Sequence, residues 1–496
     1  MTSFILFPTH LFEDISALKN ASKIYLIEHP IFFGFREKKL DFNKKKLILH
    51  RASMKFYEDY LKKNTSAKII YKDFKEIKKN GMLKGVSKEI AYYKTIDYLL
   101  DAELEKECKK YKIEADVLEP LNFLTTDEEF EEYYETVKDK KKPFFQTTFY
   151  KWQRERLDIL IKNGKPEGGK WTFDNENRKP LPKNIELPDV KIPRQDRYVK
   201  EAIEYVEGNF GGNCGEVENF WCPIDFTNAK TWLTHFLEQR FNKFGTYEDA
   251  ITERPEPFLF HSGISSSINI GILDPKFVID KAIEYGKKHK IGMNNIEGFV
   301  RQILGWREFS RFTYKYIYEE MTTINYFGAK ARIGKSFYDG TTGMLPLDHT
   351  IKKAFKNGYI HHIERLMIMG CLMMMMGIYP RDVYEWFMEF AVDSYDWVMV
   401  NNVYSMALYS DGGLTTSKAY AASSNYEMIR KSDYEKGEWE DIWNALYWNF
   451  IGEHLEKMRK MGRFGPIQAK NWERKKDKEK DKYRGIAKEF IERNCK

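Results

Sequence analysis

Two short segments of the chain carry side chains that could do chemistry. Residues 258–269, FLFHSGISSSIN, place several hydroxyl groups and a glycine on the approach to a predicted helix. Backbone N–H groups and hydroxyls at such a point can receive a phosphate, although a serine cluster there commonly serves only as a helix cap. The second segment contains two adjacent imidazoles, His361 and His362, and the pKa of an imidazole suits proton transfer near neutral pH. The fold must therefore position one segment for phosphate binding and the other for proton transfer.

Spacing excludes other familiar sites. Residues 328–336, GAKARIGKS, look like a phosphate-binding loop, but five residues separate the two glycines where four are required. The five cysteines are widely spaced and form no C-x-x-C pair, so we predict neither a disulfide framework nor a metal site. They are Cys108, Cys214, Cys222, Cys371 and Cys495. The N-terminus has no signal-peptide pattern, so we expect a reducing compartment, the cytoplasm or the nucleus.

The composition is that of a water-facing globular protein. A chain of 496 residues exceeds the usual size of one domain, so we expect two or three. The longest apolar run, residues 366–378, is shorter than the roughly 20 residues that span a bilayer, so no membrane association is expected. The net charge of +7, from 81 basic and 74 acidic side chains, would favour a polyanionic partner only if it gathered on one face.

The elements that position these segments change character along the chain. The first 120 residues alternate short apolar runs with amphipathic helical patterns, which predicts an α/β domain with a mainly parallel sheet over residues 1–124. The predicted strands cover residues 4–7, 23–27, 68–71 and 115–118, and the predicted helices cover residues 45–62 and 95–111. No G-x-G-x-x-G follows the first strand, so the usual pyrophosphate-binding turn is absent.

The remainder divides into a connector and a helical domain. Residues 125–196 are charged and rich in Pro and Gly, which indicates a long connector, and the rings of Trp171 and Phe173 indicate that it packs against a domain. Residues 197–496 have a period near 3.6 and few strand signals, which predicts an all-α domain. Continuous helical patterns cover residues 229–244, 295–320, 348–376 and 380–399.

Three further segments of the helical half accompany the serine segment. They are residues 297–309 (EGFVRQILGWREF), 343–348 (GMLPLD) and 358–367 (GYIHHIERLM). In this order and spacing, the four segments resemble the FAD-binding domain of the photolyase and cryptochrome family, and the resemblance covers nearly the whole chain. RQILGWR is also similar to the branch typified by prokaryotic (6-4) photolyases. The resemblance implies FAD as cofactor and UV-damaged DNA as partner, and we expect a monomer. It leaves open whether an antenna chromophore binds in the α/β domain.

That branch usually carries an iron–sulfur cluster, and this sequence departs from it. Residues 432–448 contain none of the three cysteines expected there, and the fourth expected position is occupied by Tyr384. Because a [4Fe–4S] cluster is normally held by four thiolates, we predict no cluster. Tyr384, Trp439 and Trp443 are expected to fill the space.

The resemblance also implies which residues hold FAD. Ser262 and Ser265 would contact its phosphates, and Tyr247 would line the same pocket. Arg307 and Arg365 would lie near the isoalloxazine ring, because an anionic reduced flavin needs nearby positive charge. The complete predicted cofactor-binding set is Tyr247, Ser262, Ser265, Asn269, Arg301, Arg307, Arg365 and Asp393, with Asp393 paired to Arg365.

The type of DNA lesion is predicted from the two adjacent histidines. Cyclobutane-dimer photolyases commonly have His-Asn at this point, whereas (6-4) enzymes have His-His, here His361 and His362. Breaking a (6-4) lesion moves a hydroxyl between bases, so a proton must accompany the electron, and His362 is the predicted donor. Animal (6-4) enzymes carry another histidine four residues on, where this chain has Leu366. We therefore predict His361 and His362 as catalytic residues of a (6-4) photolyase.

Other roles follow from the same resemblance. Gln302 and Trp306 are predicted to contact the flipped lesion, Trp306 by stacking. The neighbour of flavin N5 stays open, because an ungapped count gives Met399 whereas Asn401 or Asn402 fits only with a gap. The predicted electron-transfer residues are Trp386, Tyr395 and Trp397.

Three alternatives to (6-4) repair remain open. A cryptochrome-like photoreceptor would use the flavin for blue-light signalling without repair. A cyclobutane pyrimidine dimer photolyase would share the fold and act on the other lesion. A structural DNA-packaging or flavin-storage protein would bind flavin without photochemistry.

Overall fold

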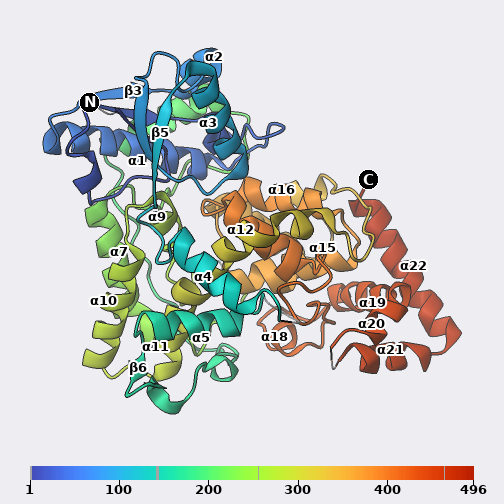
Figure 1. Cartoon of the computed structure of the whole chain (residues 1–496). Coiled ribbons are helices and arrows are strands. Elements are labelled where there is room, and N and C mark those ends of the chain that lie inside the picture. The colour runs from blue at the N-terminus through green and yellow to red at the C-terminus, as the bar shows by residue number, and fades with distance from the viewer. Residues whose placement is uncertain (1–2, 141–143, 255, 463) are drawn as a thin grey trace.

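The N-terminal unit is built on a five-stranded parallel sheet with strand order β3-β2-β1-β4-β5. The computed structural model describes residues 3–140, 144–254, 256–462 and 464–496. Figure 1 shows this unit (blue) at one end of the molecule and the C-terminal helices (red) at the other. The predicted combination of an α/β unit and a helical remainder is confirmed, while the limits of the three domains stay a prediction.

Four of the five strands follow the predicted apolar runs. The strands are β1 (Ser3–Leu6), β2 (Lys23–Ile27), β3 (Lys68–Lys72), β4 (Glu89–Tyr93) and β5 (Glu114–Leu118). The flanking helices are α1 (Lys44–Asn64), α2 (Phe74–Asn80) and α3 (Tyr98–Tyr111). The prediction missed β4, which pairs with the central strand β1. The strand was missed because its buried apolar residues end just before residue 95, where a helix was predicted to begin. In the structure, α3 begins later, at Tyr98, after the N-cap Asp97.

The connector contains regular structure that its composition concealed. It forms α4 (Asp127–Val137), α5 (Gln146–Arg156) and a short hairpin of β6 (Ile161–Lys162) and β7 (Lys165–Pro166). A capping box between Thr126 and Glu129 begins α4. Phe149 of α5 packs against Phe309 and Phe312, with ring centroids 5.6 and 5.3 Å away. The connector therefore packs against the helical domain, as its aromatic residues indicated.

The helical domain supplies most of the candidate site. Its helices are α6 (Arg197–Phe210), α7 (Phe226–Gln239), α8 (Phe241–Phe244), α9 (Ser265–Ile270), α10 (Pro275–Lys288), α11 (Met293–Val300), α12 (Glu308–Thr323), α13 (Ser336–Asp339), α14 (Leu345–Asn357), α15 (Cys371–Met375), α16 (Pro380–Phe390), α17 (Asp396–Val400), α18 (Glu427–Arg430), α19 (Glu438–Glu453), α20 (Leu455–Arg459), α21 (Gly465–Glu473) and α22 (Asp477–Asn494). Across the described ranges, no helix is both long and apolar enough to cross a bilayer.

Among the described residues of this domain, three segments are π-helical, Arg301–Arg307, Glu364–Gly370 and Asn401–Ala407. The first joins α11 to α12, the second leads into α15 and the third follows α17. π turns within α-helices frequently mark functional sites. All three fall within or beside segments that the sequence connected with flavin or lesion binding.

Two predicted helices are broken where the site is built. The pattern over residues 348–376 is interrupted after α14 by Gly358, whose φ of 63° lies in the left-handed region. A Cβ on Gly358 would lie 2.8 Å from Val392 Cγ1, so a larger residue does not fit. The pattern over residues 380–399 is likewise interrupted between α16 and α17. These breaks place His361 and Asp393 on non-helical backbone.

Helix α1 joins the two units through buried polar side chains. Lys45 Nζ donates to the main-chain oxygen of Lys356, in the last turn of α14, at 2.9 Å. Lys46 Nζ donates to the main-chain oxygen and Oγ of Ser394 at 2.6 and 2.9 Å. Ser394 directly follows Asp393. The N-terminal unit therefore closes the end of α14 and holds the loop between α16 and α17.

His50, on the same helix, is buried as a neutral imidazole. Its Nδ1–H donates to the main-chain oxygen of Phe32 at 2.8 Å, and its Nε2 accepts from the Tyr395 hydroxyl at 2.7 Å. Burial, reinforced by the nearby Lys46 charge, lowers the pKa of His50 to about 3. The unfolded imidazole binds a proton near pH 6.5 and the folded one does not. His50 therefore removes stability as the pH falls below 6.5.

We predict that His50→Gln reduces the loss of unfolding free energy between pH 7 and pH 5 by about 2 kcal/mol. Urea unfolding of the full chain at the two pH values measures this difference, whatever the effect of the substitution at pH 7. His289→Gln, which removes an exposed histidine just after α10, is the control and should keep the wild-type difference. Equal losses in all three proteins would contradict the buried neutral state of His50.

Candidate functional site

Asp393 is the hydrogen-bonding centre of the predicted cofactor site. Its carboxylate accepts from Ser265 Oγ at 2.6 Å and from Arg365 Nη2 at 3.0 Å. Its main-chain oxygen accepts from Asn269 Nδ2 at 3.1 Å. Ser265 and Asn269 belong to α9, whereas Arg365 belongs to the second π segment. Four predicted residues from three elements are thus brought together, and we call them the Asp393 group.

Arg307 lies beside this group, between two aromatic rings. Its guanidinium carbon is 4.0 Å from the ring centroid of Phe123 and 5.0 Å from that of Trp397, and Nη2 is 3.5 Å from Asn269 Oδ1. Its ion pair with Glu308 is long, at 3.4 Å, and its Nε has no hydrogen-bond partner among the described residues. Burial lowers the pKa of Arg307 to about 10, although Glu308 opposes this. A buried, under-partnered cation favours an anionic ligand.

The two adjacent histidines differ in exposure. The ring of His361 is fully buried and stacks on that of His261, with centroids 4.7 Å apart and planes 8° apart. His361 Nε2 also lies 3.3 Å from Glu364 Oε2. His362 is partly exposed, and burial, reinforced by Arg365, lowers its pKa to about 4. His362 is therefore the member of the pair that a ligand can reach.

Arg301 and Gln302 contact neighbouring carboxylates, and their predicted roles stay predictions. Arg301 lies 3.3 Å from Glu297 and 3.5 Å from Glu248, and Gln302 donates to Glu248. Burial raises the pKa of Glu248 to about 7, although Arg301 opposes this. Asp174 of the connector lies 3.4 Å from Arg301. These contacts hold the connector against the first π segment. Among the described residues, neither Arg301 nor Gln302 hydrogen-bonds to the Asp393 group.

Three more of the predicted residues keep some exposure to solvent. Tyr247 and Ser262 are partly buried, and the main-chain oxygen of Ser262 accepts from Trp232 Nε1 at 2.7 Å. Trp306 is partly exposed, with its ring 6.2 Å from that of Phe309. A partly exposed indole is available for stacking, so the predicted lesion contact of Trp306 agrees with its surroundings better than that of Gln302.

The predicted electron-transfer residues are buried in separate contacts. Trp386 packs 4.7 Å from the ring of Phe390, and Trp397 packs 5.1 Å from that of Phe123. Tyr395 is bonded to His50. Within the described residues, no ring contact joins Trp386 to Tyr395 or Trp397. Direct stacking therefore does not link the three, and their role stays a prediction.

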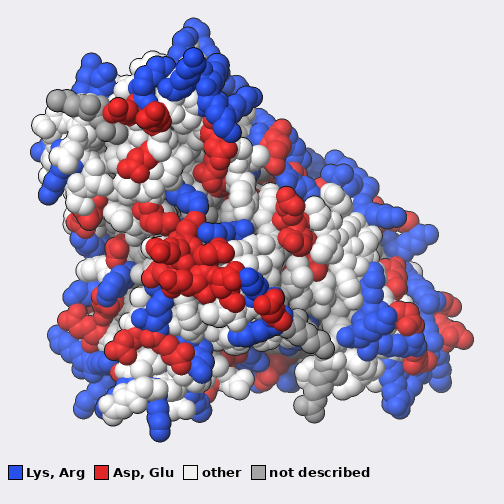
Figure 2. Space-filling model, in the orientation of Figure 1, with Lys and Arg blue, Asp and Glu red and all other residues white. Residues whose placement is uncertain are grey.

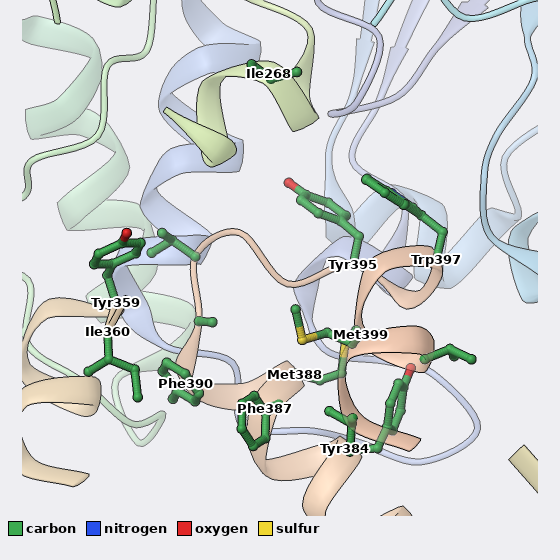
Figure 3. Close-up of a cluster of buried hydrophobic side chains, with 14 of the residues drawn as sticks. Ile268, Tyr359, Ile360, Tyr384, Phe387, Met388, Phe390, Tyr395, Trp397 and Met399 are labelled. Atoms are coloured by element: carbon green, nitrogen blue, oxygen red, sulfur yellow. The ribbon is translucent and has the colours of Figure 1, made fainter. Parts of the chain in front are cut away.

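The candidates for the flavin N5 neighbour also differ. Asn401 is fully buried, where its Nδ2 donates to Ser310 Oγ at 3.2 Å and its Oδ1 accepts from Thr415 Oγ1 at 3.3 Å. Figure 3 shows Met399 below Tyr395, in a cluster of buried apolar side chains. The amide of Asn401 is thus already engaged, whereas Met399 has only apolar surroundings.

A small cavity, about 30 Å³, separates the sheet from the Asp393 group. It lies at the carboxyl ends of β1 and β4, where the strand order reverses, and open α/β sheets bind ligands at such points. The lining residues from both units are Thr9, His10, Phe32, Lys94, Thr95, Ile96, Asp97, Pro120, Asn122, Phe123, Asn269, Tyr395 and Trp397. His10 Nδ1 and Asn122 Oδ1 are buried with no hydrogen-bond partner among the described residues. These atoms leave polar capacity for a ligand between the units.

Aromatic side chains occupy the region in which cluster cysteines were expected. The Tyr384 hydroxyl donates to the buried Asp396, and Trp443 Nε1 donates to the main-chain oxygen of Ala422 at 2.8 Å. The rings of Trp439 and Trp443 are 6.0 Å apart. Among the described residues, no three His, Cys, Asp or Glu side chains are grouped to hold a metal ion. The absence of a cluster stays a prediction.

Surface charge is uneven. Figure 2 shows lysines and arginines spread around the edges of one face and a contiguous acidic patch over α4. The sequence of α4, DEEFEEYYETV, supplies these carboxylates. Phosphates are repelled by such a patch, so the outer side of α4 is not a DNA-binding surface.

Three residues that contact the predicted site residues were not themselves predicted from the sequence. His261 stands inside the serine segment and Glu364 inside the histidine segment, so proximity to the predicted residues was an available signal. Phe123 lies at the end of the α/β unit, far from Arg307 in sequence, and the fold brings the two side chains into contact. No local pattern indicates its role.

Known proteins resemble this chain in sequence and in fold. The family model "deoxyribodipyrimidine photo-lyase-related protein" matches residues 4–222. A (6-4) photolyase of Agrobacterium fabrum is 31% identical over 405 residues, which cover 80% of this chain and 78% of the relative. The crystal structure of a bacterial class III photolyase from Agrobacterium tumefaciens has a TM-score of 0.57 and 15% identity, covering 99% of this chain and 96% of that one. A cryptochrome from Synechocystis has a TM-score of 0.56 and 15% identity, covering 98% and 99%.

The chain belongs to the photolyase and cryptochrome family. Its likeness to the (6-4) photolyase of Agrobacterium fabrum extends over most of both sequences. The two solved structures establish the shared fold, which is common to repair enzymes and photoreceptors.

Proposed function

We propose that this protein is a (6-4) DNA photolyase that uses reduced FAD and blue light. The observation that carries the proposal is the position of His362, a partly exposed imidazole three residues before Arg365. Arg365 is itself fixed by Asp393. A proton-transfer group therefore adjoins the residues that fit the cofactor.

The Asp393 group and Arg307 fit FAD. Arg307 has an unpaired Nε and one long ion pair, so it can take an anionic group of the cofactor. Arg365 is oriented by Asp393 and by the main-chain oxygen of Ile360, to which its Nε donates at 2.8 Å. The single hydroxyl hydrogen of Ser265 is donated to Asp393, so this hydroxyl would have to rotate away from Asp393 to donate to a phosphate. FAD, when bound and reduced, supplies the light-driven electron that splits the lesion.

His362 would provide the proton. Transfer of a hydroxyl between the bases of a (6-4) lesion requires a proton at the receiving oxygen or nitrogen. The donor is the imidazolium form, and the pKa of His362 near 4 in the free protein disfavours it at neutral pH. Anionic DNA phosphates close to the ring would raise this pKa and so favour the donor form.

UV-damaged DNA would reach the site with the lesion flipped out of the duplex. A damaged step is easier to flip than an intact one. The exposed side of Trp306 can stack on a flipped base, which contributes about 1–3 kcal/mol per base. Gln302 would contribute only after release from Glu248. Backbone contacts would make binding fall with rising salt.

Repair of defined lesions tests the proposal. Oligonucleotides with one (6-4) lesion, one cyclobutane dimer or no lesion are illuminated with blue light in the presence of protein with reduced flavin. We expect conversion of the (6-4) lesion alone. Conversion of the cyclobutane dimer alone would assign the other repair activity, and conversion of neither would reject photolyase function.

A cryptochrome-like photoreceptor is the second candidate. The amide of Asn401 is engaged by Ser310 and Thr415, so Met399 stays an alternative N5 neighbour. An unusual group at N5 would alter flavin redox chemistry more than binding. Light-dependent flavin reduction without conversion of either lesion would favour this candidate.

An antenna chromophore stays a prediction for the region between the units. The cavity there is about 30 Å³, whereas a chromophore-sized ligand occupies about 300 Å³ or more, so the lining would have to open to admit one. An absorption band besides that of flavin in the purified protein would support an antenna chromophore.

A further inference from the structure

A buried ion pair lies behind the two histidines. Lys353 of α14 and Glu364 are in contact through Nζ and Oε1, and their side chains are 4% and 0% exposed. The other carboxylate oxygen, Oε2, lies 3.3 Å from His361 Nε2, and among the described residues neither this oxygen nor either ring nitrogen of His361 has a hydrogen bond of good geometry. Burial of a carboxylate is unfavourable unless its charge is paired. Glu364 is thus paired with Lys353 and open toward His361.

The ring of His261, which stacks on His361, also disfavours a positive charge on His361. Nε2 of His261 lies 3.1 Å from the main-chain oxygen of Glu248, and because a carbonyl only accepts, this nitrogen carries the hydrogen. The two imidazole rings are nearly parallel at 4.7 Å, so a charge on both would be repulsive. Burial first, and neighbouring charges second, hold the pKa of each well below 6.5.

The titratable and charged groups around the stacked pair of His261 and His361 come from several elements. They are Lys353 and His349 on α14, His362, Glu364 and Arg365 in the segment that follows His361, His261 before α9, Tyr359 after α14, and Asp433 and Tyr434 before α19. The cations Lys353 and Arg365 oppose a proton on His361, whereas Glu364 favours one. Lys353 therefore decides whether the carboxylate can draw a proton onto His361.

On the basis of the proposed function, we propose that Lys353 and Glu364 are positioning residues that keep His361 neutral, with the Glu364 carboxylate favouring the tautomer that carries the hydrogen on Nε2. Of the two adjacent imidazoles, only His362 then takes up a proton. Because the side chains of Lys353 and Glu364 together carry no net charge, they orient His361 without charging it. The proton stays on the ring that the lesion can reach.

Removal of the lysine alone gives the sharpest test. In Lys353→Met the Glu364 carboxylate is unopposed, so the ¹⁵N shifts of His361 should show titration between pH 5 and pH 8. A proton on His361 disfavours one on His362, and repair at pH 7 should fall about tenfold, equivalent to one pKa unit. Lys353→Met combined with Glu364→Gln removes both charges and should return repair to within about threefold of wild type. The surface variant Glu284→Gln, which breaks the exposed pair with Lys281, should change nothing.

A second variant reports on orientation without a change of charge on His361. In Glu364→Gln the amide can donate to His361 Nε2, so the hydrogen should move to Nδ1, and the ring ¹⁵N shifts at pH 7 should reverse. This result is independent of whether Lys353→Met folds.

Two results would overturn the inference. One is a His361 that stays neutral from pH 5 to pH 8 in Lys353→Met, and the other is an unchanged tautomer in Glu364→Gln. Failure of the proposed function is a separate outcome, because wild-type protein would then repair no (6-4) lesion while the histidine shifts still test the positioning role.

Discussion

Replacing His362 by asparagine should lower the rate of light-driven (6-4) repair at least about 100-fold at pH 7, because an amide cannot donate the proton that an imidazolium can. His362 is partly exposed, so the substitution should leave folding, FAD content and DNA binding close to wild type. Single-turnover repair of a (6-4) oligonucleotide under saturating light measures the effect. His289→Asn changes an exposed histidine beyond the site and serves as the control.

The same variant separates the repair activities. Cyclobutane splitting needs no proton transfer, so a protein that repairs that lesion would keep its rate in His362→Asn. If the variant repairs the (6-4) lesion at a rate near wild type, His362 is not the donor. His361 would not replace it, because its ring is fully buried.

Asp393→Asn should weaken FAD binding about 100-fold or more. The substitution leaves Arg365 as an unpaired buried cation and removes the charged acceptor of Ser265, and breaking such a pair costs about 3 kcal/mol or more. The FAD-to-protein ratio after purification and fluorescence titration of the flavin-free protein measure the loss.

A matched substitution tests whether any aspartate would give this result. Asp280→Asn breaks the exposed pair with Lys276 on α10 and should leave FAD content unchanged. The thermal midpoint of each variant separates loss of cofactor from loss of fold. Full retention of FAD by a folded Asp393→Asn protein would remove Asp393 from the centre of the site.

The fold was predictable where burial has a simple pattern. Apolar runs revealed β1, β2, β3 and β5. Burial on both faces of the sheet explains this for β1 and β2, whereas the edge strands β3 and β5 are partly buried and mostly exposed, respectively. Helical periodicity did not reveal the breaks after α14 and α16, since apolar residues continue through both. Only Gly358 marked one of them locally. The loop that carries Asp393 is specified by contacts with α1 and α9, which lie far away in sequence.

For the site, the sequence indicated residues that stand in ordered segments, and their roles stay predictions. Ser265 and Arg365 bond to Asp393, whereas Arg301 is paired with Glu248 and Asp174 from distant parts of the chain. Local patterns do not show such partners. An ungapped count from Asp393 ends at Met399, just before the third π segment begins at Asn401, so counting alone leaves the N5 neighbour undecided.

Two lysines of α1 limit the exchange of the α/β unit between members of this family. Lys45 and Lys46 reach across the boundary to carbonyls at the end of α14 and beside Asp393. An α/β unit taken from another family member would preserve the flavin loop only if its first helix brought donors to the same oxygens. The two halves of this chain are therefore not interchangeable modules, and a chimera that matches at the domain boundary but not at these two positions should lose its cofactor before it loses its fold.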